Sequence, residues 1–287
     1  MTSADWPAPA KLNLFLHVLG RREDGYHEVQ TAYQLIDLAD DLIFGMREDG
    51  EIRRLEGPPS VPAETDLAVR AARQLQAAAN SQRGVDIRIR KRIPIQGGLG
   101  GGSSDAATTL VALNELWGVH LPVGKLAGIG RELGADVALF IHGHSAWGEG
   151  IGEQLTPIEL PPRHYAVVFP GIGVSTAEVF QASELTRNSP SLTIRGFLQA
   201  GGRNDCAPVA TGRYPEVAAA LAWLARRGDA RLTGTGSCVF AGFAERAEAE
   251  AALLDLPGVW SGFVAKGLDR SPLQERLAAE RARHGQG

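Results

Sequence analysis

The run Pro94-Ile95-Gln96-Gly97-Gly98-Leu99-Gly100-Gly101-Gly102-Ser103-Ser104 has a composition suited to binding phosphate groups. Glycine lets backbone N–H groups approach an anion with no Cβ in the way. A helix that begins at the end of such a loop adds unpaired N–H donors and a partial positive charge. Ser103 and Ser104 are suited to cap that helix or to contact a phosphate. The run therefore predicts a polyphosphate site.

The segments on either side of this loop favour a binding site over a flexible linker. Residues 85–90 alternate apolar and polar, which indicates a strand, and apolar residues from 106 to 117 recur at helical spacing. Pro94 stiffens the entry to the loop. The loop is not a Walker motif, which has lysine where Ser103 stands, and no Rossmann fingerprint fits it. We expect a strand–loop–helix unit outside these two common types.

Lys11, Asn13 and Asp136 are polar residues with two open interpretations. Lys11 and Asn13 share one face of an alternating strand at 10–18, where a lysine commonly serves solubility. Asp136 follows the helix-ending Gly134 and is placed like a helix N-cap. Residue type and spacing alone do not decide between these structural roles and a chemical one.

Tyr26 and His27 follow an Asp24–Gly25 turn that can join two strands. Aromatic and histidine side chains at a strand end commonly pack or lie at the surface, so a binding role is one of two interpretations. The same holds for a short basic cluster on the strand that enters the glycine loop, where one member could face a phosphate: Arg88, Arg90, Lys91 and Arg92.

Length and composition are those of an ordinary globular protein. The chain has 287 residues, a net charge of −4 and 44% hydrophobic residues. A chain of this length commonly divides, and the broken periodicity at 157–163 predicts domains at residues 1–160 and 161–287. The charge argues against a nucleic-acid partner. Two distant cysteines, no membrane-length apolar run and no signal peptide predict a cytoplasmic protein with reduced thiols.

The remaining pattern predicts further elements. Residues 45–62 suggest a hairpin and loop, and the charged end from residue 279 is expected to fray. Helices are expected at 66–80, 123–133, 214–227 and 244–254, and strands at 165–169, 231–243 and 262–266. Thr233-Gly234-Thr235-Gly236-Ser237 forms a second glycine-rich turn, which is either a simple bend or part of a site.

Residues 94–104 resemble the ATP loop of the galactokinase, homoserine kinase, mevalonate kinase and phosphomevalonate kinase superfamily, the GHMP kinases. Six further motifs in order are similar to the branch that phosphorylates 4-diphosphocytidyl-2-C-methyl-D-erythritol, and the resemblance covers about residues 6–273. The motifs are Pro9-Ala10-Lys11-Leu12-Asn13-Leu14, Asp24-Gly25-Tyr26-His27, Gly134-Ala135-Asp136-Val137, Glu149-Gly150-Ile151-Gly152-Glu153, Asn204-Asp205-Cys206 and Leu232-Thr233-Gly234-Thr235-Gly236.

The resemblance implies an α+β fold with a ribosomal-protein-S5-like N-terminal domain, a ferredoxin-like C-terminal domain and an active site in the cleft between them. It implies ATP as co-substrate, with Mg²⁺ expected but its ligands unknown, and a monomer or homodimer. Asp136 would accept the proton of the C2 hydroxyl, and Lys11 would stabilise charge. The implied ATP-binding residues are Lys91 and residues 94–104.

The same resemblance assigns the acceptor substrate to a further set of residues. Tyr26, His27 and Phe180 would hold the cytosine, while Asn13 and Thr176 would contact the methylerythritol or its diphosphate. Two alternatives stay open: a GHMP kinase for homoserine or mevalonate, and a non-catalytic nucleotide sensor. The cytosine-binding residues argue against the first alternative, and the retention of both Lys11 and Asp136 argues against the second.

Three residues depart from the pattern of this family. Asp66 stands where relatives often carry asparagine near adenine, and a carboxylate cannot donate to a ring nitrogen. Gln96 replaces a glycine and is expected to be tolerated with a negative φ. Ala138 replaces a proline two residues after Asp136, so the helix that begins there is expected to be less rigid.

Overall fold

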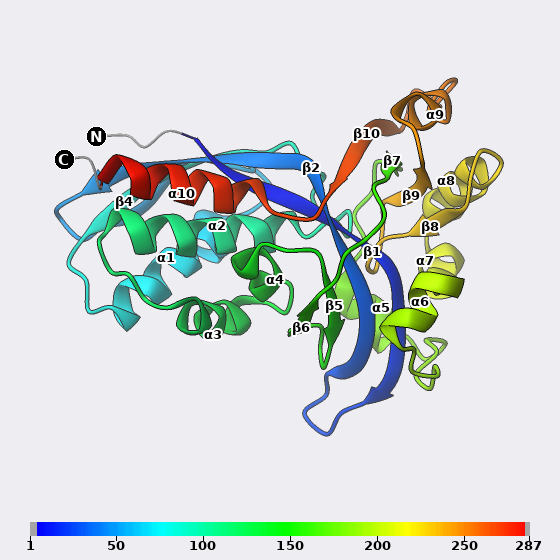
Figure 1. Ribbon diagram of the computed structural model, residues 1–287, viewed down its shortest axis with the longest axis horizontal. Coiled ribbons are helices and arrows are strands. Elements are labelled where there is room, and N and C mark those ends of the chain that lie inside the picture. Colours follow the sequence, from blue (N-terminus) through cyan, green and yellow to red (C-terminus); the bar gives the residue numbers. More distant parts are fainter. Residues whose placement is uncertain (1–4, 285–287) are drawn as a thin grey trace.

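The computed structural model describes residues 5–284, which form two lobes connected by a continuous sheet (Figure 1). Its strand order is β3-β4-β2-β10-β7-β9-β8, with β1 and β5 paired to β2, and β6 paired to β5. The strands are β1 (Trp6–Arg21), β2 (His27–Arg47), β3 (Ile52–Glu56), β4 (Gly84–Arg90), β5 (Ala146–Glu149), β6 (Gln154–Pro157), β7 (His164–Phe169), β8 (Ala230–Leu232), β9 (Val239–Phe243) and β10 (Ser261–Leu268).

Helices cover the sheet in both lobes. They are η1 (Ala63–Thr65), α1 (Leu67–Ala78), α2 (Gly101–Leu116), α3 (Val123–Leu133), α4 (Val137–His142), α5 (Thr176–Gln181), α6 (Ile194–Ala200), α7 (Ala207–Arg213), α8 (Pro215–Ala225), α9 (Arg246–Ala251) and α10 (Pro272–His284). None of the helices within residues 5–284 has both the length and the apolar character needed to cross a membrane.

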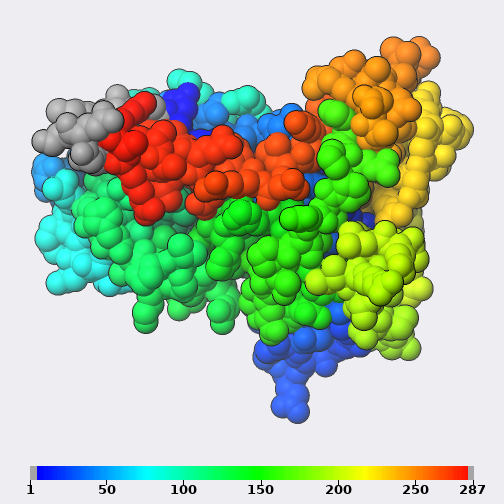
Figure 2. All heavy atoms as spheres, viewed as in Figure 1, coloured from blue at the N-terminus to red at the C-terminus, as the bar shows by residue number. Residues whose placement is uncertain are grey.

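A long antiparallel ribbon of β1 and β2 extends through both lobes and carries several of the candidate site residues. The predicted turn joins the two strands, and Gly25 adopts a φ of +88° there. The turn forms a projection at the lower edge of the molecule (Figure 2). Because successive side chains of a strand alternate between faces, Lys11 and Asn13 point to the same side of this ribbon, as predicted.

Each lobe has its own apolar core. In the N-terminal lobe α1, α2 and α10 pack on one another and against the sheet, around buried residues that include Trp6, Phe44 and Leu110. The core of the C-terminal lobe includes Val217 and Leu232. A third cluster joins residues of β1 and β2 to residues of β7, β9 and β10, and it also includes Leu99 of the glycine loop. The loop is therefore anchored where the lobes meet.

Three sequence-based expectations about secondary structure were wrong. The strand expected at 231–243 is two strands, β8 and β9, separated by the second glycine-rich turn. Residues 45–62 do not form a hairpin: β3 pairs in parallel with β4, because residues 57–83 carry the chain over the sheet through η1 and α1 before β4 begins. Within the described residues the charged end does not fray from residue 279, since α10 continues to His284 and Arg276 ion-pairs with Glu280 one turn later. Residues 285–287 lie outside the described part of the chain. Tertiary packing against β1 and α2 stabilises this polar helix.

The last part of the chain returns to the N-terminal lobe. In β10, Gly267 and Leu268 pair with Ile36 and Leu35 of β2, and the following α10 packs on β1. The predicted boundary at residue 160 lies between β6 and β7. The division into residues 1–160 and 161–287 stays a prediction.

Candidate active site

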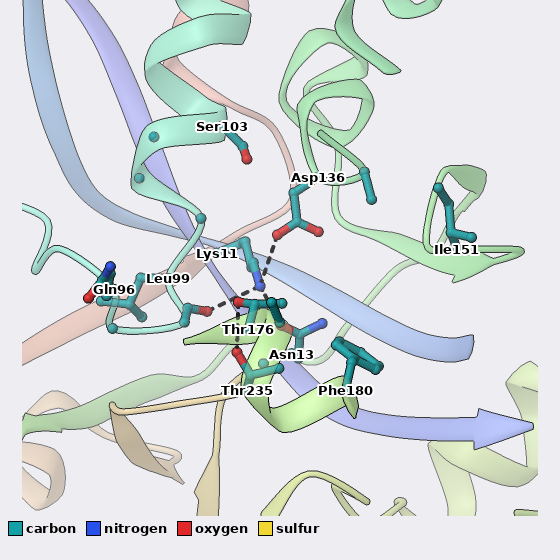
Figure 3. Close-up of a pocket in the computed structure, with 18 of the residues that line it drawn as sticks. Lys11, Asn13, Gln96, Leu99, Ser103, Asp136, Ile151, Thr176, Phe180 and Thr235 are labelled. Atoms are coloured by element: carbon teal, nitrogen blue, oxygen red, sulfur yellow. Dashed lines mark hydrogen bonds and ion pairs between the residues drawn. The ribbon is translucent and has the colours of Figure 1, made fainter. Parts of the chain in front are cut away.

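Lys11 and Asp136 meet in the middle of a cleft between the lobes (Figure 3). Lys11 Nζ lies 3.3 Å from Asp136 Oδ2. It also donates to the Gly98 carbonyl at 3.1 Å and to Asn13 Oδ1. Only 3% of Lys11 is exposed, which excludes the solubility interpretation for this lysine. Asp136 precedes α4 as its N-cap residue but makes no side-chain capping bond, so its carboxylate is available to the cleft.

Sequence reasoning missed a third contact to this pair, the hydroxyl of Tyr33. Tyr33 OH donates to Asp136 Oδ1 at 3.1 Å, and its ring centroid lies 5.7 Å from Lys11 Nζ. Burial, followed by the charge of Asp136, raises the pKa of Tyr33 well above its usual value. The phenol is therefore a neutral donor at ordinary pH. Nothing in the sequence distinguishes Tyr33 from the apolar residues that alternate along the same strand.

The glycine loop runs from β4 to α2 and takes left-handed backbone conformations that suit glycine. Gly100 is the N-cap residue of α2 with a φ of +74°, and Gly98 has a φ of +76°. Gln96 also has a positive φ, +55°, so the expectation of a negative φ was wrong. The Gln96 carbonyl accepts from the backbone N–H groups of Val174 and Ser237, which holds the residue in this conformation.

The second glycine-rich turn packs directly against the first loop. A Cβ on Gly98 would lie 2.3 Å from the Thr233 carbonyl oxygen, and a Cβ on Gly234 would lie 3.2 Å from the Gly98 carbonyl oxygen. The Thr233 hydroxyl accepts from Asn13 N at 3.0 Å. The turn is thus part of the site and not a simple bend, a conclusion that depends on contacts between distant segments.

The two serines after the glycines differ in position. Ser103 lines the cleft, and its hydroxyl is directed toward the turn that carries Asp136 (Figure 3). Ser104 is fully buried, does not line the cleft and has no hydrogen-bond partner for its hydroxyl among the described residues. Neither serine caps α2, because Gly100 occupies that position.

Lys91 lines the cleft beside the start of α2. Its Nζ donates to Asp105 Oδ2 at 2.7 Å and to Asp40, and a Cβ on Gly101 would lie 3.2 Å from it. Burial alone would lower the pKa of Lys91, but the carboxylates of Asp105 and Asp40 outweigh burial and raise it. Burial raises the pKa of Asp105 to about 7 despite the ammonium of Lys91. Lys91 therefore stays protonated near the loop, with its ammonium paired to two carboxylates.

The aromatic candidates gather at the opposite end of the cleft. The ring centroids of His27 and Phe180 lie 5.2 Å apart, and Tyr26 is 61% exposed beside them. Arg187, which sequence reasoning missed, donates to His27 Nε2 at 3.0 Å and to the Phe180 carbonyl at 2.9 Å. Burial and the charges of Arg187 and Arg21 lower the pKa of His27. Its ring is therefore neutral, with Nε2 as the acceptor.

Asn13 and Thr176 lie between the two ends of the cleft. Asn13 Nδ2 donates to Thr31 Oγ1 at 2.8 Å, so the amide spans from Lys11 to the neighbouring strand. Thr176 begins α5, and its hydroxyl lies 3.0 Å from that of Thr235 in the second glycine turn (Figure 3). These side chains form the floor beneath Lys11 and Asp136.

The cleft is one continuous cavity of about 1140 Å³. Its wall includes every predicted ATP-loop residue except Ser104, together with Lys91 and all five predicted acceptor-binding residues. A cavity of this size can hold two ligands end to end, with their reacting ends at Lys11 and Asp136.

Of the other two departures from the family pattern, Asp66 has a visible structural role. Asp66 lines the cleft, but its carboxylate already accepts from Ala68 N at 2.9 Å, as the N-cap of α1, and from Arg54 Nη1 at 2.5 Å. Its contact with adenine stays a prediction. Ala138 is buried in the first turn of α4.

Comparison with known proteins agrees with this geometry. The family models described as the GHMP kinases N terminal domain and GHMP kinases C terminal match residues 66–144 and 188–262. A 4-diphosphocytidyl-2-C-methyl-D-erythritol kinase of Halorhodospira halophila is 59% identical, with 98% of each chain covered. The kinase of the same name from Alkalilimnicola ehrlichii is 56% identical over 97% of this chain and 96% of its own.

Comparison with solved structures agrees with the comparison of sequences. A crystal structure of 4-(cytidine 5'-diphospho)-2C-methyl-D-erythritol kinase superposes with a TM-score of 0.81 at 34% identity, covering 92% of this chain and 99% of that one. A mevalonate kinase superposes with a TM-score of 0.68 at 16% identity, covering 93% and 100%, which shows a shared fold alone. The chain therefore belongs to the GHMP kinases and, within them, to the family of 4-diphosphocytidyl-2-C-methyl-D-erythritol kinases.

Proposed function

We propose that this protein transfers the γ-phosphoryl group of ATP to the C2 hydroxyl of 4-diphosphocytidyl-2-C-methyl-D-erythritol, a step of the non-mevalonate route to isoprenoids. One observation carries the proposal: a single cleft has a phosphate-binding loop at one end, aromatic side chains at the other and the Lys11–Asp136 pair between them. Such an arrangement suits an in-line transfer between two bound ligands, because phosphoryl transfer depends mainly on positioning and charge stabilisation.

In this proposal Asp136 accepts the proton of the attacking hydroxyl. A tertiary alcohol is a poor nucleophile at neutral pH, so a carboxylate within hydrogen-bond reach of it has a clear function. The Lys11 ammonium, 3.3 Å from the carboxylate, lies where it can stabilise negative charge on the transferred group. Backbone N–H groups of the loop and the start of α2 hold the ATP phosphates.

Recognition of the acceptor substrate would depend on the aromatic side chains at one end of the cleft. Tyr26 and Phe180 offer faces on which a base can stack. His27 Nε2 is engaged by Arg187, so the remaining ring N–H and the backbone of His27 are what it can offer to cytosine. Asn13 and Thr176, closer to Lys11, are placed to contact the methylerythritol or its diphosphate.

Mg²⁺ is expected to enter with ATP. Among residues 5–284 there is no group of three or more His, Cys, Asp or Glu side chains that would hold a metal by itself. This fits Mg²⁺ bound chiefly by phosphate oxygens and water, which is its usual state in kinases. When bound, it would neutralise phosphate charge. Cytoplasmic location, the absence of a nucleic-acid partner and a monomeric or homodimeric state stay predictions.

A coupled assay of ADP release tests the proposal. The protein is offered ATP with the cytidylyl substrate, with homoserine, with mevalonate and with no acceptor. We expect activity with the first acceptor only, because homoserine and mevalonate have no base to stack. Activity confined to homoserine or mevalonate would show another GHMP kinase. ATP binding without turnover on any of the three would favour a nucleotide sensor.

A further inference from the structure

Tyr33 lies inside the cleft at the centre of the sheet. It is paired across the ribbon with Asn13 of β1, and on its other side with Ala146 of β5. Only 3% of the residue is exposed, and it forms part of the cleft wall. A side chain held between two strands has little freedom, so its hydroxyl has a defined position.

The two oxygens of the Asp136 carboxylate are held by different groups. Tyr33 OH donates to Oδ1 at 3.1 Å, and Lys11 Nζ lies 3.3 Å from Oδ2. Among the described residues, the phenol and the ion pair with Lys11 are the side-chain contacts that restrain rotation of the carboxylate. The orientation of this group relative to a bound hydroxyl therefore depends on both partners.

The Glu149-Gly150-Ile151-Gly152-Glu153 motif, together with the preceding Gly148, makes room for this phenol. A Cβ on Gly152 would lie 2.4 Å from Tyr33 OH, and a Cβ on Gly148 would lie 2.6 Å from Tyr33 Cε2. Both positions therefore exclude a side chain while the ring is in place. Glycine at these positions therefore has a structural role, which is to leave space for the side chain of Tyr33.

We propose that Tyr33 is a positioning residue for phosphoryl transfer, which orients the Asp136 carboxylate. The inference rests on the proposed function, in which Asp136 is the proton acceptor. A hydrogen bond donated to a carboxylate stabilises the charged form. The charged or titratable groups that face Tyr33 and Asp136 are Lys11, which acts in the same direction, and Glu153, whose charge acts on Tyr33.

The test compares Tyr33→Phe with Tyr165→Phe. Phenylalanine keeps the ring and removes only the hydroxyl. Tyr165 is a matched control, because its buried hydroxyl donates to Gln34 Oε1 at 3.3 Å outside the cleft. We expect Tyr33→Phe to lower kcat about 5- to 50-fold, because the carboxylate loses a contact that orients it toward the substrate hydroxyl. The KM values for ATP and acceptor should stay within about twofold, and Tyr165→Phe should match wild type.

The pH profile distinguishes positioning from a structural role. With one donor fewer, the carboxylate takes up a proton more readily, so the acidic limb of kcat/KM should move to higher pH in Tyr33→Phe only. In an Asp136→Asn background, adding Tyr33→Phe should change kcat by less than about twofold, because the phenol acts through that carboxylate. An unchanged acidic limb, or a full additive loss in the double variant, overturns the proposal.

A measurement without substrate separates this inference from the proposed function. If wild type phosphorylates none of the acceptors, the proposed function fails, but the carboxyl carbon of Asp136 can still be titrated by ¹³C NMR. Protonation at a higher pH in Tyr33→Phe than in wild type and Tyr165→Phe supports the assigned contact. Identical titration in all three proteins overturns it.

Discussion

At the scale of single residues, the site depends on ionisable side chains whose environments differ sharply. The carboxylate of Asp136 stays accessible, with 27% of its side chain exposed, whereas Asp105 and Asp40 are buried around Lys91. An accessible carboxylate can meet a substrate hydroxyl. Buried carboxylates around an ammonium serve instead to hold that cation beside the glycine loop.

The first prediction at this scale concerns Asp136→Asn. An amide cannot accept the hydroxyl proton, so turnover should fall by about two to four orders of magnitude, the usual contribution of a positioned general base. ATP affinity, measured by calorimetry, should change little. Asp86→Asn is the control, because that aspartate is ion-paired with Arg47 outside the cleft. Near-native turnover of Asp136→Asn would show that Asp136 is not the proton acceptor and serves only as the N-cap residue of α4.

A second prediction concerns protein stability and Asp105. Burial raises the pKa of Asp105 to about 7 from 3.8, so the folded state binds a proton that the unfolded state has lost. Proton binding by Asp105 therefore stabilises the folded state fully below about pH 4, and this stabilisation is lost as the pH rises to about 7. Asp105→Asn should remove this decline, so its stability relative to wild type should rise by on the order of 2 kcal/mol between pH 5 and pH 8.

Urea unfolding at pH 5, 6, 7 and 8 measures this difference. Asp49→Asn is a suitable control, because hydrogen bonds from Arg47 lower the pKa of Asp49 to about 2 and its transition lies below this range. A stability difference between Asp105→Asn and wild type that does not vary with pH would contradict the prediction.

At the scale of elements, the two glycine-rich segments act as one unit. Gly98 lies against the Thr233 carbonyl, whereas a Cβ on Gly102, at the start of α2, would lie at an ordinary contact distance of 3.6 Å from Leu67 Cδ1. Glycine is thus required in the loop for two separate reasons. One is contact with the second turn, and the other is close approach of the backbone to phosphate.

The contact between the two turns can be tested with Gly98→Ala and Gly102→Ala. Gly98→Ala should lower stability by about 1–3 kcal/mol, because its Cβ meets backbone at a positive φ, and should also weaken ATP binding. Gly102→Ala should leave stability within about 0.5 kcal/mol. Thermal unfolding and ATP calorimetry on both variants check this. Equal stability of the two variants would show that the contact between the turns does not constrain the loop.

At the scale of the whole molecule, the cleft exists because β1 and β2 extend from one lobe into the other. The ribbon carries Lys11, Tyr33 and His27, the N-terminal lobe supplies the loop and Asp136, and α5 supplies Phe180. Arg187 connects the ribbon turn to the end of α5. The ATP-binding and acceptor-binding ends of the cleft are therefore formed by different parts of the chain. A substitution at one end should change the binding of one ligand and leave the other unchanged.

Phe180→Ala tests this separation. Removing the ring should weaken binding of the cytidylyl substrate by roughly 1–3 kcal/mol, the range for loss of an aromatic face beneath a base. ATP affinity should stay within about twofold, because the loop lies at the other end of the cleft. Leu198→Ala, an exposed apolar residue of the same lobe, is the control. Equal losses for both ligands would indicate a general disturbance of the fold instead of a cytosine contact.

The sequence by itself determined many of the elements and the motifs of this protein, because these depend on local periodicity and residue type. The helix at 123–133 has its predicted bounds, the Asp24–Gly25 turn joins the first two strands, and the glycine loop leads from a strand into a helix. The motif pattern was sufficient to indicate the family, which the relatives confirm.

Only the tertiary structure decided which of these residues meet and what each side chain does there. The contact of Tyr33 with Asp136, the clamp of Arg187 on His27 and the packing of Gly98 on Thr233 join residues 103, 160 and 135 positions apart. The positive φ of Gln96 and the parallel pairing of β3 with β4 likewise depend on distant partners. Local sequence carries no signal of such contacts, because they arise from packing between segments that are far apart in the chain.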